Sequence, residues 1–129
     1  MVKNEKRYGS MVSHKSVVSP NEVFAITEDS TKKYCILFDY AANNDLFKFM
    51  KQGGLPIPIA KFYALQLIEA VSAIHKANFC HRDIKCENLV LDADFNVKII
   101  DFGAACNSGR SDELVGTKGY RAPEIEVGS

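Results

Sequence analysis

The chain has 129 residues, enough for one domain of modest size. Its 16 basic and 16 acidic residues cancel, so no overall field draws it to nucleic acid or to an anionic membrane, and we expect neither partner. Apolar residues make up 47% of the chain, too many for a disordered protein, and the longest apolar runs are too short to span a bilayer.

The cysteines indicate the compartment. The chain is not cysteine-dense, its cysteines show no paired spacing, and its N-terminus lacks the apolar core of a signal peptide, so we expect reduced thiols in an intracellular, cytoplasmic protein. A metal site built from Cys80, His81 and Cys86 is an alternative, but this spacing fits no usual zinc pattern. The four cysteines are Cys35, Cys80, Cys86 and Cys106.

The first half of the chain predicts a hairpin and two helices. Residues 21–29 and 33–40 are predicted strands joined by a polar turn. Asp45 can cap a short helix that runs to Met50, and a Gly-Gly-Leu-Pro loop follows. Residues 59–76 form the strongest predicted helix, and the width of its apolar face predicts that it is largely buried. This face holds Phe62, Tyr63, Leu65, Leu67, Ile68, Ala70, Val71 and Ile74.

The stretch "HRDIKCEN", residues 81–88, gathers two acids, two bases, a histidine and an amide beside an apolar run. Taken alone it is either a solvated turn or a site that handles a highly charged group. Two short predicted strands follow, residues 89–92 and 97–100. The turn "DADFN" between them imitates the start of a calcium loop, but the required glycine and glutamate are replaced by Val97 and Gly103, so we expect a hairpin turn.

Two further motifs follow in order, "DFG" at residues 101–103 and "GTKGYRAPE" at residues 116–124. The ordered set, with a hairpin between its first two members, resembles the catalytic core of eukaryotic protein kinases. The resemblance implies an α+β, protein-kinase-like fold, with residues 1–129 forming a partial kinase domain. Residues 1–38 would be an N-lobe remnant, 39–45 the hinge, and 46–129 the first part of the mainly helical C-lobe.

The resemblance explains the charge of the first motif, because phosphoryl transfer must align a polyphosphate, metal ions and a hydroxyl against strong repulsion. It implies ATP and Mg²⁺ as cofactors. Asp83 would accept the proton of the substrate hydroxyl, and Lys85 would neutralise charge on the transferred phosphate. Asn88 and Asp101 would supply the oxygen ligands that Mg²⁺ prefers.

The segment "ILFDYAANNDLFKFM", residues 36–50, resembles the strand, hinge and short helix that hold adenosine in kinases. Phe38 would occupy the gatekeeper position, and the backbone of Asp39 and Ala41 would bond the adenine edge. Val90 would pack beneath the ring. Plain core packing is the alternative for the two apolar side chains.

Two acidic residues extend the implied nucleotide site, and a third belongs to an implied helix. Asp45 fits the acid that contacts the ribose, and Glu87 falls among the implied nucleotide contacts. Glu5, in "NEKR", matches the glutamate of the kinase helix that forms an ion pair. A glutamate in any charged helix is the alternative, and Gly9 suits a helix poorly.

The pattern HRDxKxxN at residues 81–88 and the Gly-Thr pair at residues 116–117 resemble those of serine/threonine kinases. Thr117 would hydrogen-bond near Asp83 and Lys85 and shape the place of a small hydroxyl, so the implied partner is a protein substrate with a Ser or Thr acceptor. Cys86 departs from the usual proline. Glu113 stands where many kinases carry a phosphothreonine, which suggests a pair with Arg82.

The resemblance covers nearly all of this chain, while the chain covers about the middle half of a kinase domain. We therefore expect that the rest of the domain is missing and that the polypeptide alone transfers phosphate poorly. A non-catalytic, truncated kinase-like protein that binds substrates or regulators is the alternative function.

Overall fold

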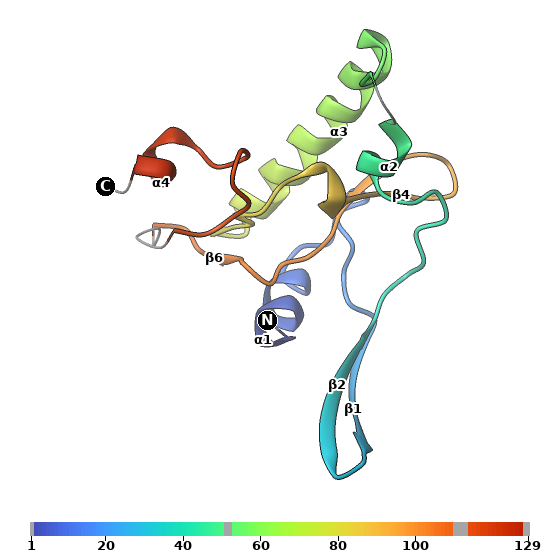
Figure 1. Ribbon diagram of the computed structural model, residues 1–129, viewed down its shortest axis with the longest axis vertical. Coiled ribbons are helices and arrows are strands. Elements are labelled where there is room, and N and C mark those ends of the chain that lie inside the picture. The colour runs from blue at the N-terminus through green and yellow to red at the C-terminus, as the bar shows by residue number, and fades with distance from the viewer. Residues whose placement is uncertain (1, 51–52, 110–113, 128–129) are drawn as a thin grey trace.

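The computed structural model describes residues 2–50, 53–109 and 114–127. Helix α1 (Val2–Gly9) leads into the antiparallel hairpin of β1 (Glu22–Glu28) and β2 (Thr31–Leu37), whose register runs from Glu22 opposite Leu37 to Glu28 opposite Thr31. The hairpin predicted from the sequence is confirmed, with slightly shorter strands. It projects away from the remaining elements at one end of the molecule (Figure 1).

Two helices follow the hairpin, as the sequence predicts. Helix α2 (Leu46–Met50) is capped by Asp45, whose Oδ1 accepts a hydrogen bond of 2.8 Å from the backbone N–H of Lys48. Helix α3 (Ile57–Lys76) starts two residues before the predicted position and carries a proline in its first turn, where the lost N–H costs nothing.

The expectation that α3 is largely buried is wrong for the described residues. Tyr63, Ala70 and Ile74 are buried, but Leu65 and Ile68 are 64% and 65% exposed. The helix packs on β3 and β5 along one side only, so the rest of its wide apolar face stays open to solvent. By length and mean hydropathy alone α3 could cross a membrane, a test that core helices of domains also pass.

The second half of the chain forms short elements around α3. Strand β3 (Phe79–Cys80) precedes the charged motif, which ends in the 3₁₀ turn η1 (Cys86–Asn88). The predicted hairpin is confirmed as β4 (Leu89–Leu91) paired with β5 (Val97–Ile99). Its turn is closed by Asp92, whose Oδ1 accepts hydrogen bonds from the backbone N–H groups of residues 94 and 96.

Strand β3 and the turn η1 were not predicted from the sequence, nor were two later elements. Strand β6 (Cys106–Asn107) pairs antiparallel with β3, and a short helix α4 (Pro123–Val127) ends the described chain. Because β6 follows the DFG motif and β3 precedes the HRD motif, this pair brings the two motifs together (Figure 1).

The core lies where α1, α3, β3 and the β4–β5 hairpin meet. Phe102 is fully buried, and its ring centroid lies 5.9 Å from that of Phe79 and 5.0 Å from that of His81. Gly9 ends α1 in this core, and a Cβ on it would lie 3.0 Å from the ring of Pro20. The close approach of Pro20 explains a glycine at a helical position that otherwise disfavours it.

Candidate active site

His81 fixes the start of the charged loop. Its Nδ1 accepts a hydrogen bond of 3.2 Å from the backbone N–H of Asp83, so Nε2 carries the proton and donates to the carbonyl of Ile100 at 2.9 Å. The side chain is 2% exposed. Burial lowers the pKa of His81 and outweighs the hydrogen bond to Ile100, so the neutral ring ties the HRD loop to the strand before Asp101.

The carboxylate of Asp83 receives hydrogen bonds on both oxygens. Oδ1 accepts from the hydroxyl of Thr117 at 2.6 Å and from its backbone N–H at 3.1 Å, and Oδ2 accepts from Asn88 Nδ2 at 3.2 Å. Lys85 Nζ lies 3.5 Å from Oδ2 and donates to Thr117 Oγ1 at 2.8 Å. Burial raises the pKa of Asp83, but the Thr117 bonds and the Lys85 charge prevail and lower it, so the carboxylate stays ionised.

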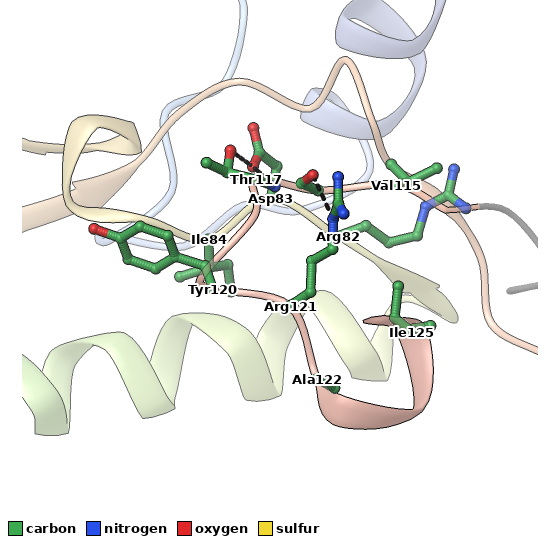
Figure 2. Close-up of a pocket in the computed structure, with 10 residues that line it drawn as sticks. Arg82, Asp83, Ile84, Val115, Thr117, Tyr120, Arg121, Ala122 and Ile125 are labelled. Carbon is green, nitrogen blue, oxygen red and sulfur yellow. Dashed lines mark hydrogen bonds between the residues drawn. The ribbon is translucent and has the colours of Figure 1, made fainter. Parts of the chain in front are cut away.

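Figure 2 shows Asp83 and Thr117 pointing toward one another at a cavity of about 250 Å³. The walls of this cavity come from the HRD loop and from the segment that leads into α4. Arg121 braces that segment, since its Nε donates to the carbonyl of Gly116 at 2.8 Å. The sequence prediction that Thr117 contacts Asp83 and Lys85 is therefore confirmed.

Asp101 and Arg82 both have a strained backbone conformation, with φ of +66° at Asp101 and +68° at Arg82. Asp101 Oδ1 accepts a hydrogen bond of 3.1 Å from the backbone N–H of Gly103. Arg82 donates from Nε to the carbonyl of Ala104 at 2.7 Å. The first bond shapes the DFG turn itself, and the Arg82 bond joins the HRD loop to the residue that follows the DFG motif.

Glu5 of α1 reaches the same region. Burial raises the pKa of Glu5 and the negative charge of Asp101 adds to the rise, while a hydrogen bond from the backbone N–H of Phe102 opposes it. Asn4, next to it, donates to the carbonyl of Gly103 at 3.0 Å. Helix α1 is therefore docked on the DFG segment, which the sequence alone did not reveal.

A second cavity, of about 460 Å³, collects most of the residues expected around adenosine. Two of its wall residues, Val18 and Ile100, were missed by the sequence analysis. For Ile100 a signal existed, because it ends the predicted strand 97–100 directly before Asp101, whereas Val18 is placed by a tertiary contact, the hydrogen bond from its N–H to the carbonyl of Ile99. The wall comprises Glu5, Val18, Phe38, Asp39, Ala41, Val90, Ile100 and Asp101.

Asp45 and Glu87 do not line this cavity. Asp45 pairs through its backbone with Val90, and its carboxylate caps α2 while Oδ2 lies 3.6 Å from Lys48 Nζ. Glu87 lies in η1, close enough to Cys86 for its negative charge to contribute, after burial, to the raised pKa of that thiol. Both acids thus flank Cys86 rather than the adenosine cavity.

The described residues contain no cluster of three His, Cys, Asp or Glu side chains that could hold a metal ion. The donor set expected for Mg²⁺ is of another kind, an amide and a carboxylate. The amide nitrogen of Asn88 is engaged by Asp83, so its oxygen is the atom that it can offer a cation, and Asp101 offers a carboxylate. These hard oxygen donors fit Mg²⁺. Glu113, expected to pair with Arg82, lies outside the described residues.

Comparison with known proteins decides the family. The model of the protein kinase domain family matches residues 1–127. The chain belongs to the protein kinase family. It is 38% identical over 126 residues to testis-specific serine/threonine-protein kinase 2 of Mus musculus, an alignment that covers 91% of this chain and 34% of that protein.

Two further relatives come from other organisms. The chain is 36% identical to the cAMP-dependent protein kinase catalytic subunit of Dictyostelium discoideum, over 95% of this chain and 18% of that protein. It is 39% identical to CBL-interacting protein kinase 15 of Oryza sativa subsp. japonica, over 89% of this chain and 27% of that protein. The chain thus spans about a third, or less, of the length of these kinases.

Proposed function

We propose that this chain carries ATP-binding and phosphoryl-transfer residues of a serine/threonine protein kinase, which moves the γ-phosphate of ATP to a Ser or Thr hydroxyl of a protein. The observation that carries the proposal is the support of the Asp83 carboxylate by Thr117, Asn88 and Lys85. A carboxylate that is fixed and kept ionised in this way can orient a hydroxyl and accept its proton as phosphoryl transfer proceeds.

Lys85 supplies positive charge beside this base. Its Nζ lies 3.5 Å from Asp83 and bonds Thr117, so it can neutralise a phosphate that approaches the substrate hydroxyl without displacing the carboxylate. In this proposal the transferred group lies between Lys85 and Asp101.

The nucleotide occupies the cavity of about 460 Å³. Phe38 and Val90 provide apolar walls for adenine, and the backbone of Asp39 and Ala41 provides hydrogen-bonding groups at its edge. Asp45 and Glu87 lie farther out and would meet the ribose or a more exposed part of the complex. Residues 39–45 then act as the hinge between an N-lobe part, 1–38, and a C-lobe part, 46–129.

Asn88 and Asp101 would hold Mg²⁺, which when bound neutralises charge on the phosphates. Other residues of this chain hold the two donors in place without the metal ion. His81 links the HRD loop to Ile100, next to Asp101, and Asp83 orients the amide of Asn88. Neither donor therefore has to be drawn from a distant part of the fold.

Thr117 and the names of the relatives support serine/threonine specificity. Thr117 bonds both Asp83 and Lys85, so the segment after it is held against the base and leaves limited room for the acceptor side chain. Each of the three relatives described above is a protein kinase, and the mouse protein is named as a serine/threonine kinase.

The test uses the gene product that contains this chain, with ATP, Mg²⁺ and a mixture of Ser/Thr and Tyr peptides. Asp83→Asn preserves shape but cannot accept a proton, so we expect phosphate transfer to fall by at least about 100-fold while ATP binding persists. Asp101→Asn should weaken Mg²⁺-dependent ATP binding instead. Transfer by Asp83→Asn at the wild-type rate would refute the proposal, and ATP binding by the wild type without any transfer would favour the binding-protein alternative.

A further inference from the structure

Two cysteines lie opposite one another on the short strand pair beside the HRD and DFG motifs. In the β3–β6 pair, Cys80 is the direct partner of Cys106. Cys80 immediately precedes His81, and Cys106 lies five positions after Asp101. The pair therefore lies in an antiparallel ladder that joins the two motif-bearing segments.

The register determines what kind of pair this is. The backbone N–H of Ser108 donates to the carbonyl of Asn78 at 3.0 Å, which makes the next pair along the ladder, Phe79 with Asn107, a non-hydrogen-bonded one. Cys80 and Cys106 are then a hydrogen-bonded pair, for which Cα atoms lie about 5.5 Å apart. That separation falls within the range of about 4.4–6.8 Å that a disulfide spans.

The side chains are also placed for reaction. Successive side chains of a strand point to opposite faces, and Phe79 is fully buried against Tyr8 and Phe102. Cys80 therefore points to the other face, together with its partner Cys106, and both are half-buried rather than enclosed. Small oxidants can reach this face from solvent.

We propose that Cys80 and Cys106 form a reversible oxidation site, which peroxide converts to an intrachain disulfide between the HRD loop and the DFG segment. One thiolate attacks hydrogen peroxide to give a sulfenic acid and hydroxide, which takes up a proton to become water. The second thiol then displaces a second water and forms the S–S bond. Two thiols and one peroxide thus give one disulfide and two waters, and a dithiol reductant returns both thiols.

The geometry favours reversibility. The Cβ atoms of directly opposite residues lie about 4.5–5.5 Å apart, whereas a relaxed disulfide needs about 3.5–4.5 Å. The bond therefore forms with some strain, and strained disulfides are the more easily reduced ones. If the proposed kinase function holds, the disulfide would also slow phosphoryl transfer, because it strains the loop that positions Asp83.

The first test does not depend on kinase activity. The folded protein is treated with stoichiometric hydrogen peroxide, blocked with iodoacetamide, digested without reduction and mapped by mass spectrometry. We expect a peptide linked through Cys80 and Cys106 as the main cross-link, with a mass 2 Da below the sum of the two thiol peptides, abolished by dithiothreitol. Urea-unfolded protein is the control, and it should give no preference for this pair. Cross-links that ignore the register, or no cross-link in folded protein, would overturn the proposal.

Variants separate the site from general thiol reactivity. Cys80→Ser and Cys106→Ser should each remove the cross-link, whereas the matched control Cys35→Ser, on the β1–β2 hairpin, should leave it intact. Circular dichroism checks that each variant is folded, and the mapping of the wild type stands even where a variant is not. In an activity assay, peroxide should inhibit Cys35→Ser reversibly and leave Cys106→Ser at its untreated rate. Equal inhibition of both would overturn the regulatory role alone.

Discussion

The hydroxyl of Thr117 lies 2.6 Å from Asp83 Oδ1 and 2.8 Å from Lys85 Nζ, so one small side chain connects the carboxylate and the ammonium group of the HRD loop. Lys85 donates a hydrogen bond to Thr117 Oγ1, so the hydroxyl proton of Thr117 is free to be donated to Asp83. A segment 34 residues farther along the chain thereby fixes the carboxylate that we propose as the catalytic base.

Replacing Thr117 by valine keeps the shape of the side chain and removes the hydroxyl. A hydrogen bond to a charged group contributes about 1.5–3 kcal/mol, so we expect kcat of the gene product to fall roughly 10- to 100-fold. ATP binding should change little, because Thr117 does not line the adenosine cavity. Steady-state kinetics with a peptide substrate measure both effects.

Thr117→Ser is the matched control, because it retains the hydroxyl and loses only a methyl group. It should keep kcat within a few-fold of the wild type. If serine and valine lowered kcat equally, the hydroxyl link between Asp83 and Lys85 would have no catalytic role.

Gly116, just before this threonine, is required by the backbone. Its φ is +93°, and a Cβ on it would lie 2.6 Å from the carbonyl oxygen of Arg82. Gly116→Ala should therefore push the segment away from the HRD loop and break the Thr117–Asp83 bond. We expect hydrogen exchange of the amides at 115–121 to accelerate, together with a loss of transfer activity.

Gly119→Ala provides the comparison for that prediction. Gly119 has a similar φ, of +89°, but nothing lies within 4 Å of its added Cβ. Both variants place an alanine in a backbone conformation with positive φ, which costs roughly 1–2 kcal/mol. Only Gly116→Ala adds the clash with the carbonyl oxygen of Arg82. Equal exchange rates in the two variants would show that the close approach to Arg82 is unimportant.

Local patterns predicted much of the fold. The hairpins, the capped helix α2 and the long helix α3 follow from alternation, from Asp45 and from apolar spacing, and the structure contains each of them. The contact of Thr117 with Asp83 was expected only through the ordered motifs, since no local pattern links residues so far apart.

What the sequence could not predict depends on tertiary contacts. The β3–β6 ladder has two residues in each strand, too few for any periodicity to appear. Val18 enters the adenosine cavity because its backbone bonds Ile99, and the exposed side of α3 reflects which elements cover it rather than its own composition. Each of these features is set by partners distant in the chain.

Buried His81 predicts a dependence of stability on pH. Because its pKa is lowered in the folded chain, the unfolded state takes up a proton first as pH falls below about 6.5. The contribution of His81 to the free energy of unfolding is therefore fully present above that pH. It is lost as pH falls toward the folded-state pKa, by at most about 1.4 kcal/mol per pH unit. Urea unfolding between pH 7.5 and 5 measures it.

His81→Phe is the variant for comparison, because it keeps an aromatic ring beside Phe102. It should be less stable at pH 7.5, having lost the bond to Ile100, but its stability should fall less steeply with acid. His14 and His75 are common to both proteins, so the difference in slope isolates His81. Parallel slopes would contradict a lowered pKa.

Gln66 joins α3 to the β4–β5 hairpin. Its Oε1 accepts from the backbone N–H of Val97 at 2.8 Å, and its Nε2 donates to Asn96 Oδ1 at 2.9 Å. Gln66→Leu leaves the N–H of the buried Val97 without this acceptor, so the free energy of unfolding should fall by about 1–3 kcal/mol. Leu65→Gln makes the reverse exchange at the neighbouring, exposed position. Leu and Gln have similar helix propensities, so this variant should change the free energy of unfolding by less than about 0.5 kcal/mol. Urea denaturation of both variants compares them directly, and a larger loss from Leu65→Gln would mean that the apolar face of α3 is covered in solution.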